Sequence, residues 1–585
     1  MSKTKSFVMC FALFILTTVN CLADPQKSQT LVAEAWKAWS ENNQQLTEAK
    51  LTAAIKEDPN NARAYLGLYL LYGMQGKDQK AWESLKVVLQ NKETSYPYLF
   101  AVMGSSGVFR QQFDTPNSEA IAMLEAMSKS ADPEGILKAM ANEALGIYYQ
   151  DQGDLVKSAR YFQNQNSIKD WLVLGPFENI SASGIEKAFP PESEFATGQT
   201  YAGKNGIPAK WFRPSAIKRD QWIDFSRYFV AEDAVFYANT FVFSPKKQTV
   251  QLRVGTSGSV KVFLNDQQLF EYLDENNNDL DTYVIETELQ EGWNRVLIKC
   301  GMSEIDSCNF MLRVTDRSGE PISGLEVSTE SKTYPRRPGA SVKVIENFAE
   351  AFFKAKIKEN PDHLENYALL AECYLRNDKA TEAELVLRQA SARASKCALF
   401  DIYMVEAYRR GEKSDEISTV YERINSTDPN IPQAVVYQIN THFANKEFDK
   451  AEELIKRYEK LRPESEELYD LKLALYEKKN LVDQSIATNQ KAFKLYPSNW
   501  SFVYGEAAYL IDSTQKYDRA ISLIEKYMAK NYDYSVLKTL AGFYLQSSNV
   551  KKWQECYNKL LELDPAASTT YWEMSEVFFK QQDYT

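Results

Sequence analysis

The sequence predicts a multidomain α+β protein, with an α-solenoid of helical hairpins at each end and an antiparallel β-sandwich (a jelly roll) between them. Two observations predict this fold. Prolines recur at a fixed interval in the C-terminal part, and apolar residues alternate with period two between residues 169 and 335. The first pattern indicates repeated helix pairs, and the second indicates short strands.

The C-terminal prolines define an interval of 34 residues. Five of them lie 68, 34, 34 and 68 residues apart in sequence. They are Pro361, Pro429, Pro463, Pro497 and Pro565. Because proline cannot continue a helix, this spacing predicts helix pairs that all end at the same point of the repeat.

Each predicted repeat also carries the residues that two stacked helices need. Tyr367, Leu370 and Tyr374 follow Pro361 at helical spacing. The second helix needs a small residue where it crosses the first, and the sequence supplies Ala383, Ala451, Ser485 and Ala520. Since one helix pair cannot bury its apolar face alone, we expect neighbouring pairs to stack around one continuous core.

A less regular version of the pattern precedes residue 168. Pro59 is followed by Tyr65 and Leu68, and "EALGIYYQDQGDLVKSARYFQ" has the same spacing of Leu, Gly, Tyr and Phe. Together with the C-terminal repeats, these residues make the chain resemble tetratricopeptide-repeat proteins over about two thirds of its length. The resemblance implies that the first helices line a groove for a peptide or partner helix. The segment 96–132 is out of phase and is interpreted as a degenerate repeat.

The middle of the chain predicts strands and turns. In "QTVQLRVGTSGSVKVFLNDQQLFEYL", Val250, Leu252 and Val254 alternate, a Gly/Ser turn is expected, and a second strand follows. Asn265 and Asp266 predict a tight turn into the next strand. "WLVLGPFEN", "QWIDFSRYF" and "AVFYANTFVF" supply further strands.

Two segments of this middle part resemble galactose-binding-like jelly rolls found beside bacterial glycoside hydrolases. They are "VKVFLNDQQLF" and "LQEGWNRVLIK". Such modules bind sugars in some proteins and are structural in others. The order of helical repeats, "WLVLGPFEN", sandwich and further repeats is similar to the front half of large exported bacterial proteins that continue into a transglutaminase-like region.

The N-terminus predicts export. Lys3 and Lys5 precede an apolar run and small residues, which is the layout of a secretory signal peptide cleaved after Ala23. A lipoprotein signal with lipidated Cys21 is the alternative. The predicted domains are a signal peptide (1–23), an N-terminal helical domain (24–168), the β-sandwich (169–335) and a C-terminal array (336–585). No later stretch reaches membrane-spanning length, so we expect the mature protein to be soluble or peripherally anchored. The signal peptide makes the expected location periplasmic or extracellular.

Five cysteines remain after removal of the predicted signal peptide, and two of them are candidates for a disulfide. "RVLIKC" and "CNFMLRV" are interpreted as the strands of one hairpin, in which Cys300 and Cys308 face each other. Two separately buried thiols are the alternative interpretation. Because disulfides form in an export compartment, the bridge is a comparable interpretation.

Composition excludes several function classes. The formal charge of −11 argues against a nucleic-acid binder, and two histidines in 585 residues argue against a His-rich metal centre or a histidine-based hydrolase. The sequence contains neither a phosphate-binding Walker loop nor a G-x-S-x-G nucleophile motif. We therefore expect no enzymatic activity and no cofactor.

Three sets of residues are candidate sites. Trp211 and Trp222 could stack on a sugar ring, although aromatic side chains more often fill a core. Alternating oxygen ligands could bind Ca²⁺, although the glycine and closing glutamate of an EF-hand are missing and a solvated hairpin tip is the alternative. These ligands are Asp274, Asn276, Asn278, Asp279 and Asp281.

The third set is the predicted partner-binding groove of the C-terminal array. Its mixed charge with occasional aromatic rings suits a polar or amphipathic peptide, while for any one residue an ordinary solvated face is the alternative. The set comprises Glu372, Arg376, Glu406, Arg409, Arg410, Asn440, Phe443, Glu477, Lys478 and Tyr509.

The sequence thus predicts an exported, non-enzymatic scaffold whose arrays bind partner proteins or peptides. One alternative is a carbohydrate-binding accessory protein that uses the sandwich. Another is the N-terminal part of a larger transglutaminase-like enzyme. The last helix leaves Met574 and Phe578 as an unshielded apolar stripe. This favours a polypeptide that continues beyond the last helix, rather than a last helix that itself caps the array.

Overall fold

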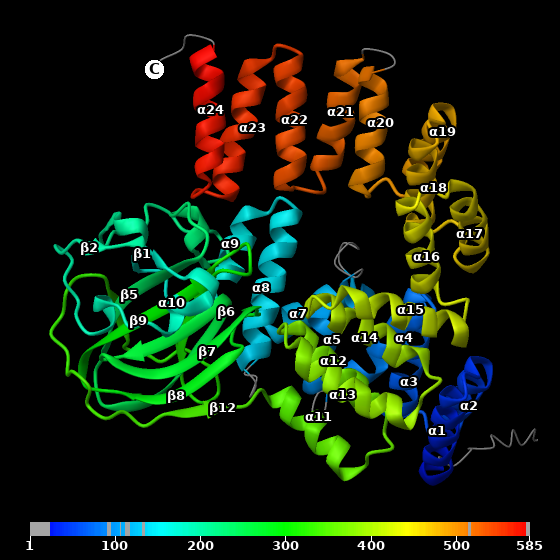
Figure 1. Cartoon of the computed structure of the whole chain (residues 1–585), viewed down its shortest axis with the longest axis horizontal. Helices are drawn as coiled ribbons and strands as arrows, with labels where there is room; N and C mark the ends of the chain where they lie inside the picture. Colours follow the sequence, from blue (N-terminus) through cyan, green and yellow to red (C-terminus); the bar gives the residue numbers. More distant parts are fainter. Residues whose placement is uncertain are drawn as a thin grey trace, which may run out of the picture.

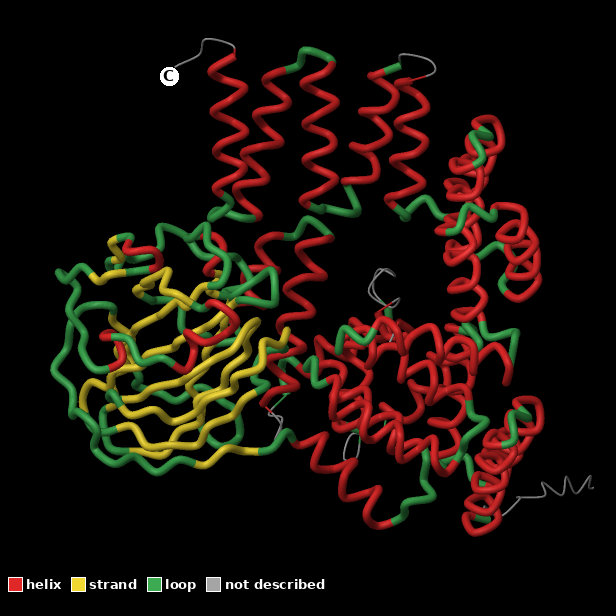
Figure 2. Tube along the Cα trace, in the orientation of Figure 1, coloured by secondary structure: helices red, strands yellow, loops and turns green. Residues whose placement is uncertain are grey.

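Helices form both ends of the chain and an antiparallel sheet forms the middle (Figures 1 and 2). This arrangement is seen in a computed structural model that describes residues 24–90, 95–105, 107–110, 118–130, 135–512 and 516–580. The predicted fold class is confirmed. The predicted signal peptide (1–23) lies outside the described residues.

The N-terminal helices pair as hairpins up to residue 163. They are α1 (Pro25–Ser40), α2 (Gln44–Glu57), α3 (Ala62–Met74), α4 (Asp78–Leu89), α5 (Tyr96–Ser105), α6 (Gly107–Arg110), α7 (Glu119–Met127), α8 (Gly135–Asp151) and α9 (Leu155–Gln163). Polar residues at the starts of α2 and α9 fix where these helices begin. The side chains of Asn43 and Asp154 accept the backbone N–H groups of Leu46 and Lys157.

The C-terminal helices follow the proline interval. They are α11 (Phe348–Glu359), α12 (Glu365–Arg376), α13 (Ala380–Arg393), α14 (Ala398–Arg410), α15 (Ser414–Thr427), α16 (Pro432–Ala444), α17 (Phe448–Leu461), α18 (Glu466–Lys478), α19 (Val482–Leu495), α20 (Trp500–Asp512), α21 (Tyr517–Met528), α22 (Tyr534–Gln546), α23 (Val550–Leu563) and α24 (Ser568–Lys580). Each of the five marking prolines lies two residues beyond the end of a helix.

The turns inside the hairpins repeat with the same interval. Five of their residues have positive φ, between 54° and 60°, and lie 34, 34, 34 and 68 positions apart. They are Asp378, Glu412, Lys446, Asn480 and Ser548. A left-handed residue ends the first helix and sends the chain back along it. The repeat predicted from the prolines is therefore confirmed by an independent backbone feature.

The two helical arrays share one core. A single apolar cluster extends from Val32 in α1 to Ala434 in α16, and α12 packs against α3 and α5. Arg376 of α12 lies over the ring of Phe100 in α5 and donates to its carbonyl at 2.9 Å. The front of the C-terminal array thus packs against the N-terminal helices.

In the part of the chain that the structure describes, ten strands form the main sheet, and two short ones form a separate pair. The strands are β1 (Leu172–Glu178), β2 (Tyr201–Ala202), β3 (Pro208–Ala209), β4 (Ile223–Asp224), β5 (Ala234–Ser244), β6 (Gln248–Leu264), β7 (Gln267–Asn277), β8 (Tyr283–Leu289), β9 (Gly292–Met302), β10 (Asn309–Thr315), β11 (Glu326–Ser328) and β12 (Lys343–Ile345). The hydrogen-bonded order runs β1-β5-β9-β6-β10-β4, with β7 and β8 also pairing with β6.

The long strand β6 organises the sheet. Its first half pairs with β8 and β10, and its second half pairs with β7 and β9. Val250 and Leu252 in the first half, and Val262 and Leu264 in the second, lie in one apolar core with residues of β5, β8, β9 and β10. The sheet therefore folds around β6, and its two halves enclose this core as a sandwich.

Two predicted turns have different outcomes. Asn265 and Asp266 adopt positive φ between β6 and β7, which confirms the tight turn. The Gly/Ser turn inside β6 is wrong, because the strand continues through it. Gly255 and Gly258 instead allow close backbone approach: an added Cβ would lie 2.5 Å from the carbonyl oxygen of Asp279 and 2.4 Å from that of Gly301, respectively.

The C-terminal helices return to the N-terminal part of the chain. Figure 1 shows α22, α23 and α24 above α8 and α9, next to the sheet. The amide of Tyr532 donates to the carbonyl of Asp151 at 2.5 Å, and Arg227 pairs with Asp564 at 2.9 Å. Arg219 donates to the carbonyl oxygens of Leu155 and Glu562. The chain thus closes on itself as a ring of helices and sheet.

The contact between α8 and the turn after β10 depends on glycine. The Gly135 amide donates to the Ser318 carbonyl at 3.1 Å, and an added Cβ would lie 2.5 Å from Gly319 Cα. We expect Gly135→Val to lower the melting temperature, because a backbone clash of this kind costs about 1–3 kcal/mol. Gly73→Ala is the control: nothing lies within 4 Å of its Cβ, so this change should be neutral or slightly stabilising. Equal melting temperatures for the two variants would contradict this contact.

Candidate functional site

Two neighbouring pockets lie in the C-terminal array, and they form the candidate partner-binding site. They involve α18, α20 and α22, which are the first helices of three successive hairpins. We call them the first pocket and the second pocket. Both are lined by Tyr504, whose side chain is 46% exposed.

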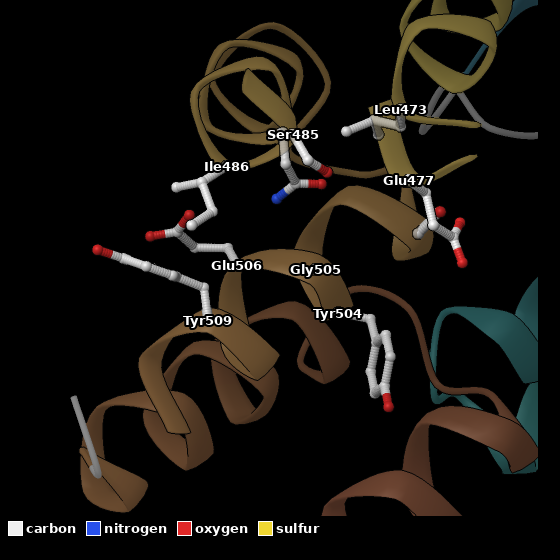
Figure 3. A pocket seen from close by; sticks show the side chains of 10 residues that line it. Leu473, Glu477, Ser485, Ile486, Tyr504, Gly505, Glu506 and Tyr509 are labelled. Atoms are coloured by element: carbon white, nitrogen blue, oxygen red, sulfur yellow. The ribbon is translucent and has the colours of Figure 1, made fainter. Parts of the chain in front are cut away.

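The first pocket has a volume of about 320 Å³ and lies between α18, α19 and α20. Figure 3 shows side chains from these three helices, with Glu477 and Tyr504 on one side and Ile486, Glu506 and Tyr509 on the other. It is lined by Leu473, Glu477, Ser485, Ile486, Asn489, Ser501, Tyr504, Gly505, Glu506 and Tyr509. Two of the predicted groove residues, Glu477 and Tyr509, are among them.

A contact between a glycine and an asparagine fixes the floor of the first pocket. The Asn489 side chain donates from Nδ2 to the Phe502 carbonyl at 3.1 Å. A Cβ on Gly505 would lie 2.6 Å from Asn489 Oδ1, so α19 approaches α20 closely only because residue 505 has no side chain.

Glu506 gives the first pocket its electrostatic character. Its Oε2 atom is buried and has no hydrogen-bond partner. Burial raises the pKa of this carboxyl, and the positive charge of Lys494 acts in the opposite direction. The pocket therefore holds an incompletely satisfied acceptor.

The second pocket has a volume of about 440 Å³ and a more aromatic lining. Trp500 packs against Tyr504 with ring centroids 5.8 Å apart. Lys538 lines the opposite side, where Glu573 of α24 pairs with it at 2.7 Å. The remaining lining residues are Thr539, Gly542, Phe543 and Gln546.

Glu372 and Arg376, the first two predicted groove residues in the sequence, do not face an open groove. Glu372 is buried and accepts a hydrogen bond from Tyr403 at 2.6 Å. The Arg376 side chain is 7% exposed and lies between Asp279 and Phe100. The prediction is corrected here, because the N-terminal array and the sheet cover this end of the C-terminal array.

The central groove residues mostly contact one another. Glu406 pairs with Arg409 at 2.6 Å and with Arg410 at 2.7 Å. Phe443 is buried beneath the ammonium group of Lys478, 5.6 Å from the ring centroid. Asn440 is exposed on α16. Apart from the buried Phe443, these residues form a polar helix surface, which was the alternative interpretation for each of them.

The predicted calcium ligands form a contact between domains instead. Asp279 pairs with Arg376 of α12, and Asp281 is buried between Arg253 (3.4 Å) and Arg313 (3.5 Å). Among the described residues, no group of three or more His, Cys, Asp or Glu side chains could hold a metal ion.

Amide side chains and backbone complete this segment. Asn276 donates to Tyr272 and Asn278 donates to Tyr283, both through side-chain amides. The backbone of Asn277 donates to Asp378 of the array, and Asp274 is exposed. This segment therefore attaches the C-terminal array to the sheet. The sequence predicted a calcium loop here, with a solvated hairpin tip as the alternative.

The two candidate sugar-binding tryptophans pack against other parts of the protein instead of projecting from a binding surface. Trp211 is only 7% exposed and lies in a small core on the outer face of β1 and β5. Trp222 packs against the shared helical core, and its Nε1 donates to Glu143 at 3.0 Å. Burial closes the Trp211 indole to a sugar ring, and the half-buried Trp222 indole is held against the helices.

The two candidate cysteines meet, but not as predicted. The hairpin between β9 and β10 is wrong, because each strand pairs with a different half of β6. Cys300 and Cys308 are nevertheless buried thiols of the same core. Burial raises the pKa of the Cys308 thiol well above its usual value, and a hydrogen bond with Cys300 adds to the effect. Disulfide formation here stays a prediction.

Several pocket residues could not be identified from the repeat pattern. Tyr504, Glu506 and Asn489 line the first pocket, yet only their packing distinguishes them from ordinary helix residues. The one available signal was Gly505, because a glycine inside a helix indicates close packing or a cavity.

Comparison with known proteins supports the nature of the hairpins. Residues 349–401, which extend from α11 to α14, match the tetratricopeptide-repeat family. This match covers the start of the C-terminal array, and helical hairpins lie on either side of the antiparallel sheet. A search of the curated proteins finds no match.

Solved structures with similar segments are distant in sequence. A tetratricopeptide-repeat protein from Parabacteroides merdae is 17% identical, covering 38% of this chain and 88% of its own, with a TM-score of 0.30. PilF of Pseudomonas aeruginosa is 14% identical, with coverages of 36% and 96% and a TM-score of 0.30. Yeast Tom70 is 12% identical, with coverages of 95% and 89% and a TM-score of 0.32. Scores of this size carry no statement about function.

None of the helices between residues 24 and 580, in the described ranges, combines the length and apolar character that crossing a bilayer requires.

Proposed function

We propose that this protein is an exported, non-enzymatic scaffold that binds a partner protein or peptide through the first and second pockets. The observation that carries the proposal is the pair of adjoining pockets on successive first helices, joined at the exposed ring of Tyr504. An extended peptide can place neighbouring side chains in two such pockets. Export is supported by the N-terminal sequence alone.

We assign the sheet a structural role within this scaffold. Asp279 and Asn277 attach it to the C-terminal array, and Trp222 attaches it to α8. Its candidate tryptophans are packed, and this favours protein binding over carbohydrate binding. The resemblances to galactose-binding-like modules and to proteins with a transglutaminase-like region remain expectations from the sequence.

The pockets can be tested with peptides selected from a random displayed library against the full chain. We expect Tyr504→Ala to weaken binding of the selected peptides about fivefold to thirtyfold, because removing a central aromatic side chain from an interface costs about 1–2 kcal/mol. The measurement is fluorescence anisotropy with labelled peptides.

A second tyrosine provides the control for this substitution. Tyr571 on α24 is 53% exposed and lies outside both pockets. Tyr571→Ala should leave the affinity unchanged. Selection of no peptide at all, or equal losses in the two variants, would contradict the proposed function.

A further inference from the structure

We propose that Cys300 and Cys308 form a disulfide in the exported protein. The bond would join the end of β9 to the residue before β10 and close the loop of residues 301–307 between the two cysteines. This inference rests on the export that the proposed function includes, because disulfides persist in oxidising compartments outside the cytoplasm. It does not depend on the two pockets.

The pairing of β6 brings β9 and β10 onto the same edge of that strand. Ser257 of β6 pairs with both β7 and β10, and Val260 pairs with both β7 and β9. Since a strand has only two edges, β9 and β10 must both lie on the edge opposite β7. The two strands therefore follow one another along β6, and residues 303–308 connect them.

The spacing of the two cysteines along this edge suits a disulfide. Cys300 lies opposite Val260. The first residue of β10 lies opposite Ser257, which puts Cys308 beside Gly258. Residues 258 and 260 point to the same face of the strand, and their Cα atoms are about 6.5 Å apart, since each residue adds about 3.3 Å. The Cα atoms of disulfide-bonded cysteines are usually about 4.4–6.8 Å apart.

The two side chains also enter the same core. Cys300 lies in the sandwich core with Ile298 of β9, and Cys308 lies there with Phe310 of β10. The Cys308 thiol is within hydrogen-bonding reach of the Cys300 thiol. No side chain separates them, because residue 258 is a glycine, and a Cβ on it would lie 3.6 Å from Cys308 Sγ. Bond formation therefore requires only a closer approach of two neighbouring sulfur atoms.

The reaction is an exchange with a second disulfide. The two thiols lose two protons and two electrons as the S–S bond forms, and the disulfide of glutathione or of a thiol-oxidising protein takes them up and becomes two thiols. Because burial raises the pKa of the Cys308 thiol, the folded protein holds little of the reactive thiolate. We therefore expect the bond to form during folding, before the core closes.

The disulfide would add to an existing attachment of the loop. The backbone N–H groups of Ser303 and Glu304 donate to Oε2 of Glu275 on β7, each at 2.7 Å. A covalent bond between the two ends of the loop would keep β9 and β10 in line along β6. Reduction should therefore destabilise the sheet.

One tryptic peptide tests the proposal. Trypsin cuts after Lys299 and Arg313, so both cysteines lie in the peptide 300–313. The full chain is expressed in a bacterial host with its own N-terminal sequence, isolated from the periplasm, denatured and alkylated with N-ethylmaleimide before digestion. We expect this peptide to be unlabelled and two hydrogen atoms lighter than the dithiol form, and to take up two labels after reduction. Cys556, in the separate core of α20–α24, is the internal control and should be labelled in every sample.

Thermal unfolding with and without reductant gives a second readout. Reduction should lower the melting temperature of the wild type by about 3–8 °C, as expected for the loss of a disulfide that closes a short loop. Cys308→Ala removes the bond, so reductant should leave its melting temperature unchanged. Cys397→Ala removes another buried thiol and is the matched control, which should respond to reductant as the wild type does.

The outcomes separate the disulfide from the rest of the proposed function. Two labelled thiols in the peptide from periplasmic protein, or equal responses to reductant in the wild type and Cys308→Ala, would overturn the disulfide and leave export and peptide binding intact. A chain that stays in the cytoplasm would contradict export instead. Refolding that chain in a glutathione redox buffer then decides: a bridged peptide supports the disulfide, and two thiols overturn it.

Discussion

Replacing Asp266 by asparagine is expected to lower the stability of the sheet by about 3–5 kcal/mol. The fully buried carboxylate accepts from Arg295 Nη1 at 2.7 Å, from Arg336 Nε at 2.6 Å and from the Tyr334 hydroxyl at 2.9 Å. Asparagine keeps the size of the side chain and the positive φ of the β6–β7 turn, but it removes the charge that the buried Arg295 needs.

Hydrogen exchange of the full chain can measure this loss region by region. The opening free energies of amides in β5, β6 and β9 should fall together, because Arg295 lies on β9 and also contacts Asn239 of β5. Asp449→Asn is the matched control: Asp449 is 98% exposed, and its solvent-screened pair with Lys479 should contribute little to stability. A loss below about 1 kcal/mol at Asp266 would show that its charge is not essential to the fold.

Replacing Glu143 by glutamine is expected to stabilise the protein at pH 8 and to leave its stability unchanged near pH 4. Burial raises the pKa of this carboxyl to about 7, and the negative charges of Asp279 and Asp220 add to the effect. The Trp222 indole and Arg376 act in the opposite direction. Glutamine keeps an oxygen that can accept the Trp222 hydrogen bond.

The sign follows from the difference between the folded and unfolded pKa. The unfolded glutamate ionises near its ordinary value of 4.5, and the folded one ionises near 7. The wild type therefore loses stability as the pH rises from about 4.5 to 7, and the loss stays constant above that range. We expect the variant to gain about 1–3 kcal/mol at pH 8, since each unit of pKa shift corresponds to about 1.4 kcal/mol.

Denaturant unfolding at pH 4, 6 and 8 measures this dependence. Glu576→Gln on the exposed surface of α24 is the control and should show no pH-dependent gain. A Glu143→Gln variant that is equally stabilised at every pH, or destabilised at pH 8, would contradict the raised pKa.

The sequence predicts the repeats well because they are local. Pro361, Pro463 and Pro565 mark the helix ends, and the left-handed turn residues keep the same interval. Both features depend only on residues of one hairpin, so periodicity reveals them.

Contacts between distant parts of the chain were not predictable in this way. Arg376 and Glu372 have the correct repeat phase for a groove, yet the N-terminal array and the sheet cover them. Asp279 and Asp281 have the alternation of a metal loop, but arginines of other elements neutralise them. Which surface a partner can reach depends on long-range packing, and periodicity contains no such information.

The middle of the chain shows the same limit at shorter range. Gly255 and Gly258 predict a turn locally, although they serve close backbone approach within the continuous strand β6. Cys300 and Cys308 were expected to meet through a hairpin, and they meet because β9 and β10 both follow β6. The two thiols share one core, and β6 rather than a hairpin brings them there.

Hydrogen exchange of the full chain with and without a library-selected peptide tests the central proposal most directly. Binding at the two pockets predicts slower exchange in α18, α20 and α22, and this protection should disappear in Tyr504→Ala at the same peptide concentration. Protection confined to the sheet or to α24, with these three helices unchanged, would contradict the proposal that the C-terminal array recognises the partner.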